Sequence, residues 1–123
     1  MILNIIICVF NEEKTIKIVL DNVLKVSLPN RIKKKIIVID NNSTDNTKKI
    51  LERYNNKIIK IIYNKKNIGK GGSIIKSLNY CEGDLVVFQD ADLEYEPKNY
   101  ILLINEMIKK NNHAVFGSRV IDG

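Results

Sequence analysis

Short runs of β-branched and other apolar residues alternate along this chain with segments whose apolar residues recur at helical spacing. The runs predict strands at residues 3–9, 35–40, 57–63, 84–89 and 113–116, and the segments between them predict helices at 13–26, 43–54, 71–80 and 98–110. This alternation is typical of a parallel sheet with right-handed crossovers and helices on both faces. The predicted fold class is therefore α/β, and such folds bind ligands at the carboxyl ends of their strands.

Local signals give the predicted helices a starting point and an inward face. Ser43 or Thr44 is expected to cap the second helix, since hydroxyl side chains are favoured at that position. In the third helix, Ile74, Ile75 and Leu78 follow helical spacing and are expected to point inward.

The most informative segment for function runs from residue 83 to 97 and reads GDLVVFQDADLEYEP. Its apolar run is typical of a strand buried on both faces of a parallel sheet. If the chain stays extended beyond this strand, Asp90, Asp92 and Glu94 project to the same side. Converging carboxylates repel one another unless a cation lies between them, and Mg²⁺ or Mn²⁺ would fill that role with oxygen ligands from a substrate diphosphate. The other interpretation is a solvated acidic loop after a strand.

Length and cysteine content limit the class of protein. A chain of 123 residues is enough for one domain with a single core. No uncharged apolar stretch is long enough to span a bilayer, and the apolar run at the N-terminus is interpreted as a strand rather than a signal peptide. Cys8 and Cys81 lie at unrelated places, which favours packing roles for both thiols in a reduced, cytoplasmic protein.

The chain is basic, with a net charge of +6 from 20 lysine and arginine residues against 14 aspartate and glutamate residues. Much of the excess lies in basic runs at residues 33–35, 48–49 and 65–70. Two interpretations stay open, a basic face toward phosphates or anionic lipid and a solvated lysine-rich surface. Nucleic-acid binding is not expected, because aromatic residues do not interleave with the basic runs.

Five segments, in order along the chain, resemble motifs of the family 2 glycosyltransferases of the GT-A fold. They read VFNEEKTI, VIDNNSTDNT, NIGKGGSI, QDADLEYEP and FGSR. Within that family the chain most resembles the polyprenyl-phosphate sugar transferases of the dolichol-phosphate mannose synthase type. The resemblance implies a GT-A, Rossmann-like fold that continues only as far as the fifth strand. Residues 1–123 would form the nucleotide-sugar-binding portion of such a domain.

The resemblance assigns the donor nucleotide to the ends of the first two strands. Phe10, Asn11 and Glu12 would border the nucleotide, and Asp40 would contact its base. A carboxylate can accept hydrogen bonds from the N–H groups of uracil or guanine, and an aromatic ring can lie against a base. The alternatives are a helix start for Asn11 and Glu12 and a turn acid for Asp40.

The resemblance assigns the glycine turn and the acidic segment to the diphosphate and the metal. The spacing NIGKGG fits neither a Walker motif nor a dinucleotide fingerprint, but its glycines let the backbone approach a ligand. Lys70 would offer a positive charge to the diphosphate or else point to water. Asp90, Ala91 and Asp92 would contact the nucleotide-sugar. Asp90, Asp92 and, as a third ligand, Glu94 would hold Mg²⁺ or Mn²⁺.

The implied reaction is transfer of a sugar from a UDP- or GDP-linked donor, with the metal ion neutralising charge on the departing diphosphate. The implied acceptor is a polyprenyl phosphate, which needs no protein base, or else a glycan hydroxyl, which does. Asp92 and Arg119 are the expected catalytic residues, with Arg119 holding an acceptor phosphate or forming a structural salt bridge. The expected location is cytoplasmic, with peripheral contact to the membrane.

Several features depart from the family pattern. Family members commonly have Pro, Tyr, Asp and Gly at the positions of Cys8, Phe10, Asn41 and Asn42. The chain also stops before the acceptor side of the family, which implies a donor half that is a fragment or is completed by a partner chain or by self-association. The alternatives are a nucleotide-sugar-binding module without transfer and a flavodoxin-like regulatory domain. The latter explains neither the glycine turn nor the FGSR segment.

Overall fold

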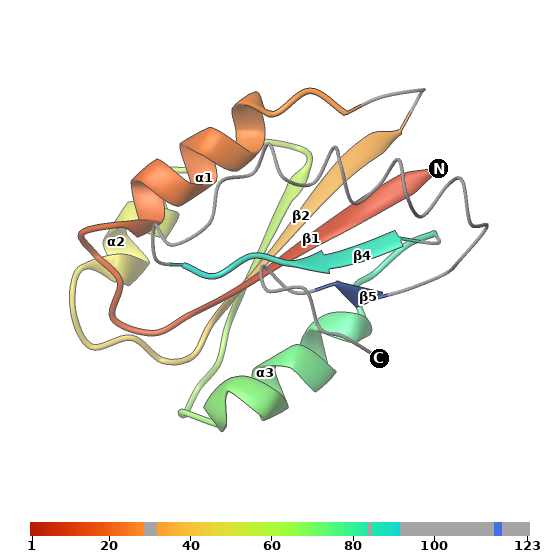
Figure 1. Ribbon diagram of the computed structural model, residues 1–123. Helices are drawn as coiled ribbons and strands as arrows, with labels where there is room; N and C mark the ends of the chain where they lie inside the picture. Colours follow the sequence, from red (N-terminus) through yellow and green to blue (C-terminus); the bar gives the residue numbers. More distant parts are fainter. Residues whose placement is uncertain (29–31, 84, 92–114, 117–123) are drawn as a thin grey trace.

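Parallel strands form one sheet in the computed structural model of the protein (Figure 1). The structure describes residues 1–28, 32–83, 85–91 and 115–116. Within these ranges the strands are β1 (Ile2–Val9), β2 (Lys33–Asp40), β3 (Ile59–Tyr63), β4 (Leu85–Phe88) and β5 (Val115–Phe116), and the helices are α1 (Ile16–Lys25), α2 (Thr47–Leu51) and α3 (Gly69–Leu78). The strand order is β3-β2-β1-β4-β5, and every pairing is parallel. The predicted α/β class with a parallel sheet is therefore confirmed.

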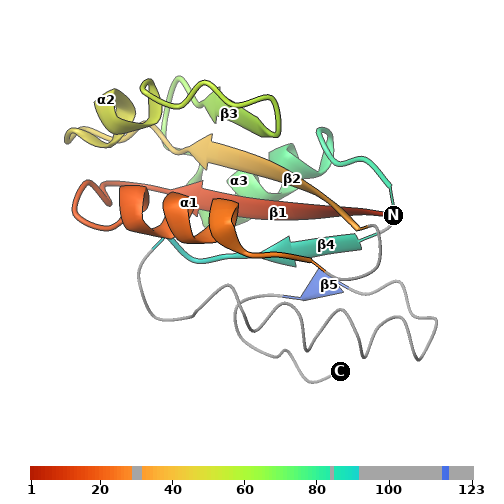
Figure 2. The same cartoon turned by 90° about the horizontal axis from the view of Figure 1, so that it is seen from above.

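The central strand β1 is buried on both of its faces. It pairs with β2 along its whole length and with β4 on its other side. The side chains of Ile5, Ile6 and Ile7 are at most 1% exposed, although successive side chains of a strand point to opposite faces. Helices cover both faces, with α1 and α2 on one side of the sheet and α3 on the other (Figure 2). This layered arrangement is the one that the alternating sequence predicts.

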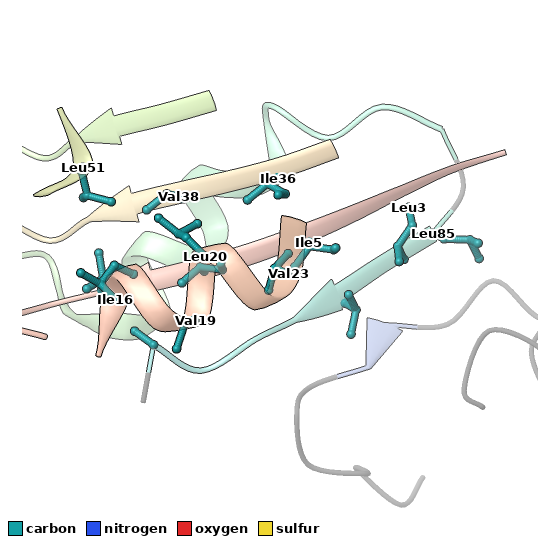
Figure 3. Packing of buried hydrophobic residues seen from close by; sticks show 14 of the residues in the cluster. Leu3, Ile5, Ile16, Val19, Leu20, Val23, Ile36, Val38, Leu51 and Leu85 are labelled. Atoms are coloured by element: carbon teal, nitrogen blue, oxygen red, sulfur yellow. The ribbon is translucent and has the colours of Figure 1, made fainter. Parts of the chain in front are cut away.

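The larger core lies between α1 and the sheet (Figure 3). The inward face of α1 contributes Ile16, Val19, Leu20 and Val23, whose helical spacing is visible in the sequence. Alternate residues of β1, β2 and β4 meet this face, and Leu51 of α2 lies in the same cluster. The sheet residues of this core are Leu3, Ile5, Ile7, Val9, Ile36, Val38, Leu85 and Val87.

The core between α3 and the sheet is smaller, and the predicted inward face of α3 is wrong. Ile75 and Leu78 are 70% and 46% exposed, and Ile74 is half-buried, whereas the fully buried positions of this helix are serines. The Ser73 hydroxyl accepts a hydrogen bond of 3.1 Å from Asn64 Nδ2, just beyond the end of β3. Turning Ile75 and Leu78 inward would break this buried bond. A polar contact therefore sets the rotation of the helix.

Two helices are shorter than predicted because nearby residues make other hydrogen bonds. The N–H groups of Thr15 and Ile16 both donate to Glu12 O, at 3.1 and 2.9 Å, so a turn precedes α1 and the helix begins at Ile16. Helix α2 has only five residues, and neither Ser43 nor Thr44 caps it. The hydroxyl groups of these two residues bond to the loop after β1 instead.

The C-terminal elements are described only in part. Val115 and Phe116 pair in parallel with β4, which confirms the fifth strand at these two residues. The predicted helix at residues 98–110 lies outside the described residues. None of the helices in the described ranges is both long enough and apolar enough to cross a bilayer.

Lys34 of β2 forms hydrogen bonds with the C-terminal end of α1. Its ammonium group donates to three carbonyl oxygens, Val23 O at 2.6 Å, Leu24 O at 3.0 Å and Val26 O at 2.5 Å. Carbonyl groups in the last turn of a helix have no donor within the helix, and positive charge there also interacts favourably with the helix dipole. Burial lowers the pKa of Lys34. The middle lysine of the basic run at 33–35 is therefore a structural residue rather than part of a solvated surface.

Replacing Lys34 by Met should lower the free energy of unfolding by about 1–2 kcal/mol, because three carbonyl oxygens lose a charged donor. The matched control is Lys33→Met, which removes the same charge from an exposed position of the same strand. Urea denaturation followed by circular dichroism measures both variants. Equal stabilities for the two would contradict the structural role of Lys34.

Candidate functional site

A cleft of ≈ 390 Å³ lies at the carboxyl ends of β1, β2 and β4, the edge toward which their arrowheads point in Figure 2. Its walls come from the last residues of β1, from the loops after the strands and from the start of α3. The cleft residues that the sequence predicted are Phe10, Glu12, Lys70, Asp90 and Ala91, and the wall also includes Cys8, Val9, Asn41, Asn67, Gly69 and Ser73. This edge is the one at which a parallel α/β sheet binds ligands.

Asn11 joins the loop after β1 to the loop after β2. Its φ angle is +52°, a left-handed conformation that asparagine adopts more readily than most residues. Its Oδ1 accepts hydrogen bonds from the backbone N–H groups of Thr44 at 2.7 Å and Asp45 at 3.2 Å, and its own N–H donates to Ser43 Oγ at 2.9 Å. Asn11 is not among the described residues that line the cleft. Its side chain connects two loops, and its contact with a nucleotide stays a prediction.

Phe10 and Glu12 flank Asn11 and both line the cleft. Phe10 is 44% exposed, so its ring has surface available to a base. Glu12 N–H donates to Thr47 Oγ1 at 3.0 Å, and its backbone oxygen accepts from Thr15 N–H at 3.1 Å and Ile16 N–H at 2.9 Å. Glu12 therefore closes the turn before α1 and also lines the cleft, so the two interpretations of this residue are compatible.

Asp40 is completely buried at the end of β2 and precedes the cleft residue Asn41. Its Oδ2 accepts a hydrogen bond from Ser43 N–H at 3.3 Å, as expected of a turn acid. Its Oδ1 has no hydrogen-bond partner among the described residues. A buried acceptor without a donor costs about 1–3 kcal/mol, so a ligand N–H at this oxygen would be stabilising. Asp40 is not among the described lining residues, and its contact with a base stays a prediction.

Three asparagine side chains form a hydrogen-bonded series beside the cleft, which the sequence did not predict. Asn64 Nδ2 donates to Asn41 Oδ1 at 3.2 Å, and Asn41 Nδ2 donates to Asn67 Oδ1 at 2.9 Å. Asn41 Oδ1 also accepts from Ile68 N–H at 2.9 Å, and Lys76 Nζ donates to Asn64 Oδ1 at 2.8 Å. The series joins the ends of β2 and β3 to the glycine turn. No local motif signals it, because its members are spread over residues 41–67.

Lys70 and Asp90 bring opposite charges together at the cleft. Lys70 Nζ lies 3.2 Å from Asp90 Oδ1, and their side chains are 70% and 24% exposed. Gly69 precedes the lysine with a φ of +77°, a conformation that favours glycine, and its N–H donates to Asn67 Oδ1 at 2.9 Å. The backbone of the glycine turn is thus held in place, while the lysine side chain reaches the end of β4.

Cys8 contributes a neutral thiol to the cleft wall. Burial raises the pKa of Cys8 to about 11, while the charge of Lys70 lowers it and that of Asp90 raises it. The thiol is therefore protonated near neutral pH and is a poor nucleophile. Cys8 and Cys81 are both free, and both pack against the apolar cluster on the α3 side of the sheet, which confirms their predicted packing role.

Asp90 is the predicted metal ligand that lines the described part of the cleft. Asp90 provides a hard carboxylate ligand, and Mg²⁺ is commonly held by one or two carboxylates with water and substrate phosphates completing its shell. Among the described residues, no three His, Cys, Asp or Glu side chains converge as a complete protein site. The predicted ligands Asp92 and Glu94 lie outside the described residues, as does Arg119. The residues present fit an ion that Asp90 shares with a diphosphate.

Known proteins share the sequence pattern and the fold of this chain. The undecaprenyl-phosphate 4-deoxy-4-formamido-L-arabinose transferase of Proteus mirabilis is 32% identical over 120 residues, which cover 94% of this chain and 36% of that protein. The structure of S. aureus TarS 1–349 in complex with UDP-GlcNAc matches with a TM-score of 0.76 at 27% identity, over 90% of this chain and 32% of that one. The mannosyltransferase PcManGT of Pyrobaculum calidifontis, in complex with GDP-Man and Mn²⁺, matches with a TM-score of 0.69 at 25% identity, over 79% of this chain and 29% of that one.

These matches confirm the predicted GT-A fold. The chain spans about a third of the length of these relatives. The pattern of glycosyl transferase family 2 matches residues 4–123. Because that match covers nearly the whole sequence, including β1 to β4 and the cleft at their ends, the chain belongs to glycosyl transferase family 2.

Proposed function

We propose that this chain binds a nucleotide-sugar in the cleft and supplies the donor side of a metal-dependent glycosyl transfer. The observation that carries the proposal is the cleft at the strand ends, in which Lys70 Nζ lies 3.2 Å from Asp90 Oδ1. An ammonium group suits a diphosphate, and a carboxylate suits a divalent ion that binds the same diphosphate. The UDP-GlcNAc complex of TarS and the GDP-Man and Mn²⁺ complex of PcManGT support this assignment.

Different residues would bind the base and the diphosphate of the donor. Asp40 accepts a hydrogen bond from the base, and the ring of Phe10 lies against it. Asp90, together with Asp92 beyond the described residues, would hold the metal ion, and Lys70 would offset the charge of the diphosphate. A bound Mg²⁺ or Mn²⁺ would neutralise the charge that develops on the departing diphosphate.

The acceptor that we propose is a polyprenyl phosphate. The similarity to the undecaprenyl-phosphate transferase of P. mirabilis supports this choice. A phosphate oxygen is already a nucleophile and needs no protein base, whereas a glycan hydroxyl, the alternative acceptor, requires one. Arg119 would hold the acceptor phosphate through charge-assisted hydrogen bonds. Such an acceptor would bring the protein to a membrane surface as a peripheral protein.

The hydrogen bonds of Asp40 leave both a uridine and a guanosine donor open. Uracil presents a single N–H on its pairing edge, whereas guanine presents an N–H and a neighbouring amino group. Asp40 Oδ2 already accepts from Ser43 N–H, which leaves Oδ1 as the oxygen without a partner among the described residues. A carboxylate oxygen can accept more than one hydrogen bond, so this carboxylate suits the single N–H of uracil as well as the paired donors of guanine.

Calorimetric titration with UDP should show binding that depends on Mn²⁺ and is abolished by a chelator. Asp90→Asn and Asp92→Ala should each weaken the binding roughly tenfold or more, because a hard carboxylate ligand is lost. Glu52→Gln, at the exposed end of α2, is the control for the change in charge and should bind UDP as the wild type does. If the folded protein binds UDP equally well with and without the chelator, the proposal is contradicted.

Asp40→Asn should stabilise the free protein and at the same time weaken UDP binding. Replacing a fully buried carboxylate by a neutral amide should raise the free energy of unfolding by about 1 kcal/mol. Loss of the acceptor should lower the affinity for UDP roughly tenfold. Urea denaturation and calorimetry measure the two effects.

The control for this substitution is Asp45→Asn. Asp45 accepts hydrogen bonds from Thr47 N–H at 2.9 Å and Glu13 N–H at 3.3 Å. Burial alone would raise the pKa of Asp45, but the hydrogen bonds of Thr47 and Glu13 hold it below its usual value. Asp45→Asn should therefore destabilise the protein, in contrast to Asp40→Asn. Unchanged UDP affinity in Asp40→Asn would remove Asp40 from the proposed base site.

Bound nucleotide should protect Cys8 from alkylation, because Cys8 lines the cleft. Cys81 follows α3 outside the cleft and serves as the internal control. Burial raises the pKa of Cys8 to about 11, so the reaction with iodoacetamide is run at about pH 9, where more thiolate is present than at neutral pH. With Mn²⁺ and UDP at about ten times its Kd, the rate at Cys8 should fall roughly tenfold, with no change at Cys81. Mass spectrometry separates the two sites, and an unprotected Cys8 would place the nucleotide elsewhere.

A further inference from the structure

The ion pair of Lys70 and Asp90 links two elements that are distant in the sequence. Lys70 is the second residue of α3, and Asp90 follows the end of β4. Their charged atoms lie 3.2 Å apart, and both residues line the cleft. Both charges also act on the pKa of Cys8, in opposite directions, so the pair lies beside the thiol in the cleft wall.

The carboxylate that Lys70 contacts is also the metal ligand of the proposed function, on which this inference rests. An ammonium group and a divalent cation beside one carboxylate repel each other. A bound diphosphate reduces this repulsion, because its oxygens accept hydrogen bonds from the ammonium group and its negative charge attracts the metal ion. Lys70 would therefore weaken metal binding when the cleft is empty and strengthen it when a diphosphate is bound.

We propose that Lys70 is an exchangeable counter-ion for Asp90. With no nucleotide in the cleft, the ammonium group neutralises Asp90 and weakens metal binding. When a nucleoside diphosphate binds, the ammonium group moves to the diphosphate oxygens and leaves the carboxylate to the metal ion. Metal and nucleotide then bind with positive coupling, and by linkage each raises the affinity for the other by the same factor.

The local structure allows this exchange without movement of the backbone. Gly69 N–H and Ile68 N–H are each held by an asparagine oxygen at 2.9 Å, so the turn before Lys70 is anchored. The Lys70 side chain is 70% exposed, and an exposed ion pair is weak enough to change partners. The anchored turn keeps Lys70 at the cleft with and without nucleotide, while its flexible side chain can contact either Asp90 or the diphosphate.

The test is a calorimetric titration of Mn²⁺ into the wild type, Lys70→Met and Lys70→Arg, first without nucleotide and then with saturating UDP. Without nucleotide, Lys70→Met should bind Mn²⁺ roughly three- to tenfold more tightly than the wild type, because a competing cation is gone. With saturating Mn²⁺, the same variant should bind UDP roughly tenfold more weakly. Lys70→Arg keeps the positive charge and should resemble the wild type in both titrations.

Lys66→Met is the matched control, since Lys66 is exposed, lies four positions before Lys70 and is not among the described cleft residues. It changes the net charge equally and should leave both affinities unchanged. Circular dichroism checks that each variant is folded.

Opposite shifts of the two affinities in Lys70→Met alone would support the exchange. Equal Mn²⁺ affinities of the wild type and Lys70→Met without nucleotide would overturn it, as would the absence of Mn²⁺ binding by every variant. If UDP binds the wild type with Mn²⁺ while those metal affinities are equal, only the exchange fails. If UDP does not bind the wild type at saturating Mn²⁺, the proposed function fails and the exchange fails with it.

Discussion

The burial of β1 is the constraint on which the rest of the structure depends. Its backbone pairs with β2 on one side and β4 on the other, and helices cover both of its faces. A polar side chain within such a strand must find all its partners inside the protein. Asn4 does so, since its Nδ2 donates to Glu82 O and Leu85 O and its Oδ1 accepts from Glu82 N–H. Apart from the Cys8 thiol near its end, the other polar side chains at β1 follow its last residue, which places the candidate chemistry at the strand ends.

The loops at those ends are held by amide side chains rather than by the strand ladders. Asn11 bonds to the loop after β2, and Asn41 bonds to the loop before α3. Loop backbone groups lack ladder partners, so side-chain amides that both donate and accept can satisfy several of them at once. Asn64 extends the series to Ser73 on α3, which connects the rotation of that helix to the cleft wall. The packing of α3 and the shape of the candidate site therefore depend on the same hydrogen bonds.

Two carboxylates at the strand ends, Asp90 in the cleft wall and Asp40 behind it, are the groups that a ligand would contact under the proposed function. Asp40 Oδ1 is buried without a partner among the described residues, and Asp90 is neutralised by a lysine whose side chain is mostly exposed. A core selected for stability alone would replace the first group by an apolar or fully bonded one. Under the proposed function, the nucleotide base would complete the hydrogen bonds of Asp40, and the diphosphate with its metal would take over both members of the ion pair.

The sequence by itself determined the order of the elements, the parallel sheet, the inward face of α1 and the family, because apolar spacing and ordered motifs are local properties of the chain. The family resemblance, together with the common edge at which parallel strands end, also placed Phe10, Glu12, Lys70 and Asp90 at the cleft. Only the tertiary structure decided the rotation of α3, the use of Asn11 between loops and the asparagine series. These depend on hydrogen bonds between residues far apart in the chain, and no local spacing encodes such contacts.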